Sequence, residues 1–593
     1  MKVSRFSSVP TARRKSNSRG VGLLDSVVGV ALMVIIFVGI SGVFKLSIEL
    51  VSNNKARVGA LALAQGHMEY IHSLDYDAVG TTGGIPSGAL TEISQETLNG
   101  VLYTRRTLIR YIDDPKDGLG VADQNSIPTD AKEVKIELSW VTRGQLRSSS
   151  LITRRSPDGI EQLVPGGTLS ISVLDASSTP IQGALVDIVN ASTSVDTQAY
   201  SNDTGTVSFL GAPAGTGYRI TVSKSGYSSA QTYNASSTNS SPDPGHLTVA
   251  LNQTTSATFV IGLVGTHTFM TYEAIQERMW NDTFADVSKL YAVASSTIAG
   301  GAVVLEGGAG SYEPEGFIRA VPVSVSYLSA WNEVHFADSK PSGTAIRYYI
   351  YADDVGTLVP DADLPGNSSG FTASPIDISS LSTTTYTTVR VGAVLTTLDS
   401  DETPRINDWE VRYDQGPIPL GNVPFTMTGA KTIGTHSGAP VYKFIQTYQT
   451  DAGGGLDIGN LEFDTHRLAI DGATLGHDIA ESCPPLPRSL FAGGGLLTRL
   501  YFLPHTAHSL RVDVRAADGT TVPNASVRLY RTGVNTTQTT GGCGQTFFSN
   551  LAWGTISGGN AYAVDITAAG YAPQTITSVE VSGASSVSAI VAP

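Results

Sequence analysis

The sequence predicts a multidomain chain, in which a long N-terminal transmembrane α-helix and a small antiparallel sheet precede a series of mainly-β sandwiches. An uncharged apolar run at residues 27–44 stands directly behind a basic segment. The chain holds 62 glycines and only 15% charged residues, a composition typical of β-rich modules with many turns. One order of strand-like segments recurs along the 593 residues, which are enough for several domains.

The apolar run is long enough to cross a hydrocarbon core as a helix, and Ser41 is its one polar side chain. Residues 1–24, before Asp25, contain no acidic residue. They contain six basic residues, which are Lys2, Arg5, Arg13, Arg14, Lys15 and Arg19. The positive-inside bias therefore predicts a single-pass protein with a cytoplasmic N-terminus and an extracytoplasmic body. The small-residue cleavage site of a secretory signal peptide is poorly formed after the run.

Gly20 followed by VGLLD resembles the type IV prepilin signal. The resemblance implies that a prepilin peptidase removes residues 1–20 by cutting between Gly20 and Val21, and that the apolar segment stays on the mature protein. Asp25 stands where the family usually has glutamate, and the resemblance implies that its carboxylate pairs with the terminal ammonium of a neighbouring subunit. Val21 replaces the common aromatic residue, and Gly42 stands where many major pilins have proline. A plain N-terminal anchor is the alternative.

The helical pattern becomes amphipathic after Phe44 and continues to about Leu74, so its apolar stripe needs a partner. Strand-like runs at residues 101–112, 133–141 and 146–153 would provide a small antiparallel sheet. Residues 21–155 are thus expected to form a pilin-like helix and headpiece, with the membrane segment at about 24–45. The linking loop offers three calcium candidates without EF-hand spacing, or a solvated acidic turn: Asp113, Asp114 and Asp117.

Two segments share one four-strand order, GTLSISVLD to YRITVSKSGY and HSLRVDVRAADG to YAVDITAAGY. In both, a tyrosine (Tyr218, Tyr562) precedes a Gly-Tyr pair by the same interval, and a divergent middle copy begins at IPLGNVPFTMTG. These segments resemble carboxypeptidase-regulatory-like or transthyretin-like modules, which implies seven-stranded sandwiches without a protease site at 166–262, 416–505 and 508–593. They are also similar to adhesin stalk repeats that cross-link lysine to asparagine, for which Lys431 beside Glu462 is the candidate.

Between the first two copies, residues 266–414 alternate apolar and polar residues in runs such as SAWNEVHFA, IRYYIYADD and TPRINDWEVRYD. This pattern predicts a jelly-roll or discoidin-like sandwich. Sandwiches of this kind often bind glycans through exposed aromatic residues, and Trp331 and Trp409 are the candidates. The alternation favours the other reading, in which they lie in the core, because each stands inside an alternating run whose one face must be buried.

Cys483 and Cys543 are the only cysteines, and in an exported chain they either form a disulfide or remain two buried thiols. The ten histidines show no metal-ligand spacing, and no catalytic triad, P-loop or dinucleotide fingerprint occurs. We therefore expect no enzyme, no metal centre and no cofactor.

These resemblances imply a minor or tip type IV pilin or pseudopilin-like surface protein that displays β-sandwiches for adhesion or filament assembly. Its expected partners are the membrane, other pilin subunits, prepilin peptidase and a surface glycan or protein ligand. The alternative is a membrane-anchored glycan-binding or cell-wall-associated protein outside any filament. The formal net charge of −14 argues against binding of nucleic acid by the bulk surface.

Overall fold

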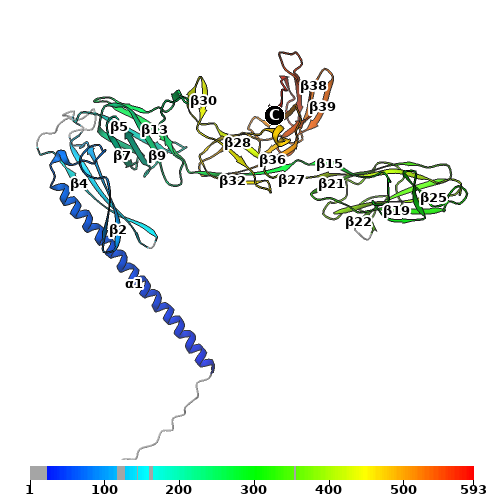
Figure 1. The fold of residues 1–593 in the computed structure, drawn as a ribbon, viewed down its shortest axis with the longest axis horizontal. Helices are drawn as coiled ribbons and strands as arrows, with labels where there is room; N and C mark the ends of the chain where they lie inside the picture. Colours follow the sequence, from blue (N-terminus) through cyan, green and yellow to red (C-terminus); the bar gives the residue numbers. More distant parts are fainter. Residues whose placement is uncertain (1–22, 117–126, 128, 143, 159–163, 353–355) are drawn as a thin grey trace, which may run out of the picture. The chain divides into compact units, whose positions relative to one another are not determined.

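The computed structural model describes residues 23–116, 127, 129–142, 144–158, 164–352 and 356–593. Its secondary structure is one long helix followed by a succession of β-strands (Figure 1). The chain divides into two compact units. The first holds residues 1–174, 179–222 and 246–259, and the second holds residues 175–178, 223–245 and 260–593.

The long helix α1 (Leu23–His72) has two halves of different character. Most of the described side chains from Val30 to Leu50 are exposed, whereas the second half buries a stripe that begins with Ala56, Ala60 and Ala64. Residues four apart lie on one helix face, and alanines there let the backbone approach a neighbouring sheet closely. The Tyr103 hydroxyl accordingly donates a 2.8 Å hydrogen bond to the Ala56 carbonyl.

A four-stranded antiparallel sheet in the order β1-β2-β3-β4 covers this helix stripe. Alternate residues of β3 are buried against the helix, from Val134 to Trp140. The order of helix then small sheet is the one expected from the sequence, with β1 as an additional strand. The bounds are β1 Ile93–Leu98, β2 Val101–Ile112, β3 Ala131–Thr142 and β4 Gln145–Arg155, with a short 3-10 helix at Tyr76–Ala78.

The first unit also contains a β-sandwich. One sheet has the order β13-β5-β8, and the other joins β9, β6 and β7, with β12 paired to β9. Strand β5 alternates strictly, so Leu169, Ile171 and Val173 are fully buried between the sheets. The bounds are β5 Gly167–Leu174, β6 Leu185–Asn190, β7 Val195–Tyr200, β8 Thr206–Ala212, β9 Gly215–Ser223, β12 Leu247–Val249 and β13 Thr254–Val260.

The middle sandwich, in the second unit, is built from two segments that are far apart in sequence. Strand β14 (Gly265–Glu273) pairs in parallel with β36 (Gly495–Pro504) and antiparallel with β32 (Gly455–Leu461). The opposite sheet has the order β31-β28-β33-β35. The other bounds are β27 Ile418–Pro419, β28 Pro424–Gly429, β31 Ile445–Gln449, β33 Asp464–Ala469, α2 Gly472–Leu475, β34 His477–Cys483 and β35 Arg488–Leu490.

Short strands extend this part of the unit. The small sheet β11-β29-β30 joins residues 223–245 to the middle sandwich. The bounds are β10 Ala230–Gln231, β11 Ser241–Pro242, β29 Thr432–His436 and β30 Ala439–Tyr442.

The third sandwich repeats the strand order of the middle one. Its first strand, β37 (Ser509–Ala516), lies between β40 (Gln545–Phe548) and β43 (Ala584–Val591), and its pairing with β43 is again parallel. The opposite sheet has the order β39-β38-β41-β42. The remaining bounds are β38 Ser526–Arg531, β39 Val534–Thr539, β41 Tyr562–Thr567 and β42 Gln574–Val579.

This equivalence corrects the expected boundary between the inserted module and the middle sandwich. The sequence assigned residues 266–273 to the jelly-roll-like module at 266–414 and began the middle sandwich at 416. The structure instead makes β14 the opening strand of the sandwich, because β14 pairs with β32 and β36. The middle copy looks divergent in sequence because a whole module separates its first strand from the rest.

The inserted module enters and leaves through a two-stranded ribbon. Glu273 lies opposite Ile418, and Gln276 lies opposite Gln415. Beyond the ribbon the chain forms two six-stranded sheets. One has the order β17-β18-β26-β21-β24 with β15 paired to β26, and the other has the order β16-β19-β25-β22-β23 with β20 paired to β25.

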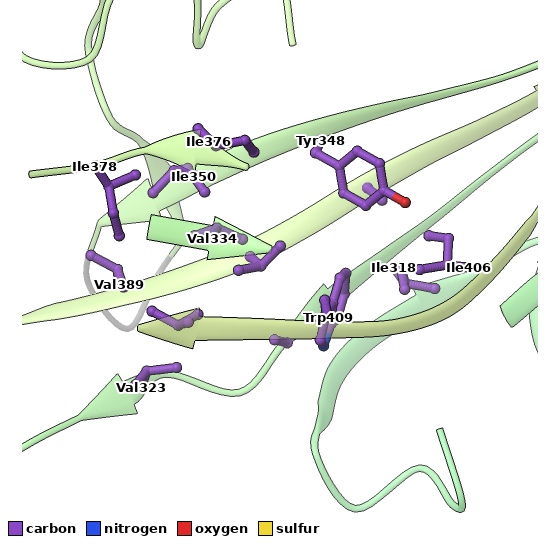
Figure 2. Close-up of a cluster of buried hydrophobic side chains, with 14 of the residues drawn as sticks. Ile318, Val323, Val334, Tyr348, Ile350, Ile376, Ile378, Val389, Ile406 and Trp409 are labelled. Carbon is purple, nitrogen blue, oxygen red and sulfur yellow. The ribbon is translucent and has the colours of Figure 1, made fainter. Parts of the chain in front are cut away.

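The strands of the first sheet are β15 Gln276–Asp282, β17 Ser296–Ala299, β18 Ala302–Leu305, β21 Leu328–Ser339, β24 Ile376–Asp377 and β26 Arg405–Gln415. Those of the second are β16 Leu290–Ala294, β19 Glu315–Ala320, β20 Val323–Ser324, β22 Thr344–Ala352, β23 Thr357–Leu358 and β25 Thr388–Thr397. Figure 2 shows the apolar core between these sheets, with Trp409 and Tyr348 among aliphatic side chains. The module therefore has a core of its own.

Two buried histidines lie in the core of the middle sandwich. His267 on β14 and His466 on β33 are 0% and 2% exposed, and their ring centroids are 6.1 Å apart. His267 Nε2 lies 2.9 Å from the Thr498 hydroxyl. Burial, with smaller contributions from His466 and Arg488, lowers the pKa of His267 to about 4, and burial also lowers the pKa of His466. Both rings are thus neutral at pH 7.

We predict that replacing residues 274–417 by Asn-Gly leaves the middle sandwich folded. Glu273 and Ile418 are already cross-strand partners, so a two-residue turn can join them as a hairpin. Calorimetry should show the transition of the middle sandwich at nearly its original temperature. The matched control removes residues 265–417, which deletes β14 and should abolish that transition. Equal damage from the two deletions would contradict the discontinuous sandwich.

A second prediction is that the middle sandwich loses stability in mild acid. The unfolded chain binds protons at its histidines below about pH 6.5, while folded His267 resists protonation until about pH 4, so stability falls as the pH drops through this window. The slope is about 1.4 kcal/mol per pH unit for His267, or roughly 3 kcal/mol in all. Denaturant unfolding of His267→Gln should show a shallower pH dependence than wild type. The exposed His436→Gln should match wild type, and identical slopes for all three proteins would refute the assignment.

Candidate functional site

The exposed half of α1 is a candidate interaction surface of the first unit. Met33 is 76% exposed and Phe37 is 74% exposed, and the stretch Val30–His72 is long and apolar enough to cross a membrane. The most apolar part of this stretch is not buried inside the protein. Because each buried methylene gains about 0.8 kcal/mol, such a surface requires an apolar partner. One N-terminal apolar helix is therefore compatible with a single-pass membrane anchor.

The side chains predicted for cleavage and assembly lie outside the part of the chain that the structure describes. Gly20 and Val21 lie outside the described residues. Asp25 falls within α1, but its side chain also lies outside the described part of the chain. Cleavage after Gly20 and charge pairing of Asp25 stay predictions.

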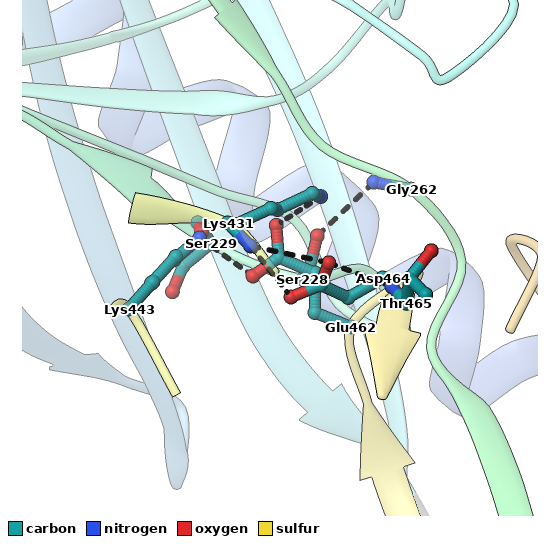
Figure 3. Close-up of polar contacts among 8 residues, drawn as sticks. All are labelled: Ser228, Ser229, Gly262, Lys431, Lys443, Glu462, Asp464 and Thr465. Carbon is teal, nitrogen blue, oxygen red and sulfur yellow. Dashed lines mark hydrogen bonds and ion pairs between the residues drawn. The ribbon is translucent and has the colours of Figure 1, made fainter. Parts of the chain in front are cut away.

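A charged cluster lies where residues 228–229 meet the middle sandwich (Figure 3). Glu462 accepts from two lysines, at 2.8 Å from Lys431 Nζ and 2.6 Å from Lys443 Nζ. Lys443 Nζ also donates to the Ser229 carbonyl at 2.8 Å. Burial lowers the pKa of Lys431, and the hydrogen bond with Glu462 opposes this shift. The cluster is an internally satisfied network that holds residues 228–229 in place.

The surroundings of Lys431 favour an ion pair over the lysine–asparagine cross-link considered from the sequence. Its Nζ contacts Glu462 and lies 3.2 Å from the centroid of the Phe463 ring. Its backbone N–H donates to Asp464. Among the described residues, no asparagine is a partner of the Lys431 side chain.

The middle and third sandwiches are clamped by a covalent bond and a hydrogen-bond pair. The Cα atoms of Cys483 and Cys543 are 5.5 Å apart, and their sulfurs are joined. Next to them, Gln545 and Ser482 exchange two hydrogen bonds of 2.9 and 3.0 Å. The Cys543 backbone N–H also donates to Glu481, whose pKa is raised by burial. The clamp therefore links β34 of one sandwich to the loop before β40 of the next.

Trp331 and Trp409 are not glycan contacts, which corrects that expectation. Both are 0% exposed, and the Trp331 indole N–H donates to the Tyr386 carbonyl at 2.7 Å. Alternation along β21 and β26 turns both rings into the core of the inserted module. Exposed aromatic residues of the module include two on the other sheet, where Tyr291 is 55% exposed and Phe317 is 39% exposed. Sequence reasoning missed these two residues.

The acidic loop after β2 is only partly described. Asp113 and Asp114 lie in the described part, where the Asp114 backbone N–H donates to the Asp130 carboxylate, whereas Asp117 lies outside it. Within the described ranges, no group of three or more metal-ligating side chains occurs. Calcium binding by these aspartates is thus without support from the described residues.

In the first unit, a cavity of about 290 Å³ separates the outer face of the headpiece sheet from β7 and β8. Arg106 joins two residues that line this cavity, because it pairs with Glu92 at 3.2 Å and donates to the Gln198 carbonyl at 3.3 Å. Burial raises the pKa of Glu92, and Arg106 opposes that shift. These contacts attach the first sandwich to the headpiece.

Comparison with family models matches residues 168–262 to the carboxypeptidase regulatory-like domain. This match confirms the resemblance for the first sandwich, predicted at 166–262. A comparison with curated protein sequences found no match. For the middle and third sandwiches, the transthyretin-like assignment stays a prediction.

The solved structures that resemble parts of this chain include several pilin subunits. The Bacillus anthracis TIE protein is 12% identical, with 85% of this chain and 75% of that chain covered and a TM-score of 0.15. BcpA, the major pilin subunit of Bacillus cereus, is 8% identical, with coverages of 72% and 99% and a TM-score of 0.13. The full-length major pilin SpaD from Corynebacterium diphtheriae is 11% identical, with coverages of 72% and 97% and a TM-score of 0.13. Scores this low transfer no role to this chain.

We predict that reduction of the Cys483–Cys543 bridge lowers the melting temperature of the middle and third sandwiches. The cysteines are 60 residues apart, and the loop-entropy model gives a bridge of this span on the order of 4 kcal/mol. Calorimetry with and without reductant measures the shift. The double variant Cys483→Ser, Cys543→Ser should melt like the reduced protein and ignore reductant. Two thiols that react in the folded, unreduced protein would contradict the bridge.

Proposed function

We propose that the chain is a minor or tip subunit of a type IV pilin-like filament, which waits in the membrane before assembly and displays β-sandwich modules outside the cell. The observation that carries the proposal is the two-part helix α1. Its first half is apolar and uncovered, and its second half is covered by a small antiparallel sheet. A helix of this design can exchange lipid for the helices of neighbouring subunits without unfolding the headpiece.

The carboxylate near the start of the helix supports the filament over a simple anchor. Asp25 stands two residues before the uncharged run. A charge within an apolar environment costs free energy unless it is paired, and an anchor alone gives it no partner. A neighbouring subunit cut after Gly20 would supply an ammonium at Val21. The pair would form only between subunits.

The remaining sandwiches explain why such a subunit would be minor. Three sandwiches and an inserted module follow the headpiece, and bulk of this size would crowd every position along a filament. We also propose that the middle and third sandwiches belong to the same structural class as residues 168–262, because in all three the first strand (β5, β14 or β37) lies between the last strand and a middle strand of its sandwich.

The second candidate is a surface protein that stays in the membrane and joins no filament. It is favoured by the length of the exposed apolar stretch, which by itself suffices to span a bilayer. Unlike the first candidate, it assigns no role to the Asp25 carboxylate.

We predict that the mature protein begins at Val21 and that Asp25→Asn lowers filament incorporation while Asp25→Glu keeps it. The asparagine variant should still insert and be cut, because the apolar run and Gly20 are unchanged. Loss of one partner of a buried pair costs about 3–5 kcal/mol, which is more than a hundredfold in the equilibrium of subunit addition. Mass spectrometry of the mature N-terminus and fractionation of sheared filaments measure the two effects.

Membrane levels of the two variants must be held equal for this comparison. Equal incorporation of Asp25→Asn and Asp25→Glu would exclude the intersubunit pair. A mature protein that still begins at Met1 would exclude the prepilin signal, and the membrane-anchored alternative would then stand.

A further inference from the structure

The outer face of one sheet of the inserted module concentrates tyrosine and arginine. In the order β16-β19-β25-β22, residues directly opposite one another share a face. Ile318, Ala393 and Tyr348 are opposite one another and buried in the core. Their chain neighbours therefore point outward. We call this surface the tyrosine–arginine face and define it by Tyr291, Phe317, Arg319, Arg347, Tyr349 and Tyr351.

The rings of this face are held in position by guanidinium groups. Arg319 lies 4.1 Å from the centroid of the Tyr351 ring, and Arg390 lies 4.1 Å from that of Tyr291. Arg390 is only 2% exposed and acts as a support beneath the surface. Arg347 is exposed and donates to the Ser369 carbonyl at 2.8 Å. Side chains fixed in this way lose little conformational entropy when a ligand binds.

A glycine at the centre lets an aromatic ring lie across the sheet. A Cβ at Gly392 would stand 2.7 Å from the Tyr351 ring. Gly392 lies opposite Arg319 of β19 and opposite Tyr349 of β22. The space left by its missing side chain is therefore between β19 and β22. The surface is therefore a platform of ring faces and edges.

The charge of this face is opposite to that of the whole chain. The chain has 52 acidic and 38 basic residues, yet the sequences of β16, β19, β22 and β25 contain one acidic residue, Glu315 at the start of β19. The same four strands carry three arginines, which are Arg319, Arg347 and Arg390. A surface depleted of acid in an acidic protein favours an anionic ligand.

We propose that the tyrosine–arginine face binds an acidic polysaccharide. Sugar rings offer C–H faces that pack on Tyr291, Phe317 and Tyr349, while a guanidinium such as that of Arg347 matches the geometry of a carboxylate. The inference deepens the proposed display function by naming the chemical class of the displayed module's ligand.

A nucleic acid fits this face less well. Affinity for a phosphate backbone grows with the number of phosphates that are neutralised, and Arg347 is the one exposed cation among the three arginines. An acidic glycan such as hyaluronate, in which acidic and neutral sugars alternate, has fewer charges per sugar than a nucleic acid and needs fewer cations to neutralise it. The aromatic surface, rather than charge alone, would then supply most of the contact area.

The test measures binding of the full chain, in detergent micelles, to polygalacturonate and to hyaluronate by calorimetry. We expect binding to at least one of them, and weaker or no binding to neutral dextran and to an oligothymidylate. Arg347→Gln and Tyr351→Ala should each weaken binding at least about fivefold, as expected for central contacts. Tyr327→Asn is the matched control, because Tyr327 is 53% exposed in the same module but outside the face; it should bind like wild type.

Four outcomes would overturn the proposal: no binding to either acidic polymer, equal binding to dextran, stronger binding to the oligothymidylate, or wild-type affinity of both face variants. Arg347 is on the surface, so Arg347→Gln should unfold at the wild-type temperature. If Tyr351→Ala destabilises the module, the affinity of Arg347→Gln decides whether the face binds the polymer. If the wild-type protein is cut at Val21 and incorporated into filaments but binds neither acidic polymer, the result counts against the ligand of this face alone. The proposed function would remain.

Discussion

Parallel pairing of a first strand with a last strand is the interaction on which the second unit depends. In the middle sandwich β14 pairs with β36 from Thr266 to Glu273, and in the third β37 pairs with β43 from Ser509 to Ala516. Each pairing joins the two ends of a sandwich, so neither sandwich is complete until its last strand has been made. An insertion after the first strand is tolerated because the ribbon at Glu273 and Ile418 returns the chain to its starting point.

Periodicity in the sequence predicted the elements better than it predicted their partners. The long helix, the headpiece sheet and the first sandwich follow from local patterns, and residues 168–262 match the expected domain. The place of β14 could not be predicted, because its partner β36 lies beyond the whole inserted module and no local pattern records that pairing. Alternation had the same limit for Trp331 and Trp409, since it separates two faces without saying which one is buried.

The candidate surfaces differ in how far the sequence alone predicts them. The exposed half of α1 follows directly from an uncharged run, and its role with Gly20 and Asp25 rests on sequence alone. The tyrosine–arginine face had a signal in IRYYIY, where Arg347, Tyr349 and Tyr351 alternate with buried residues. Its other half, from β16 and β19, joins it only through strand pairing across β25. A contact surface assembled from four strands is a property of topology.

The ribbon that carries the inserted module also determines how the protein bears mechanical load. A pull on the module is shared by its two strands, which run side by side to the middle sandwich through Glu273 and Ile418. On the β14 side, the tension acts along a strand that is bonded to β36 and β32 over most of its length. Force along such a strand shears many hydrogen bonds at once instead of opening them one after another. The module is thus mounted where the sandwich resists extension.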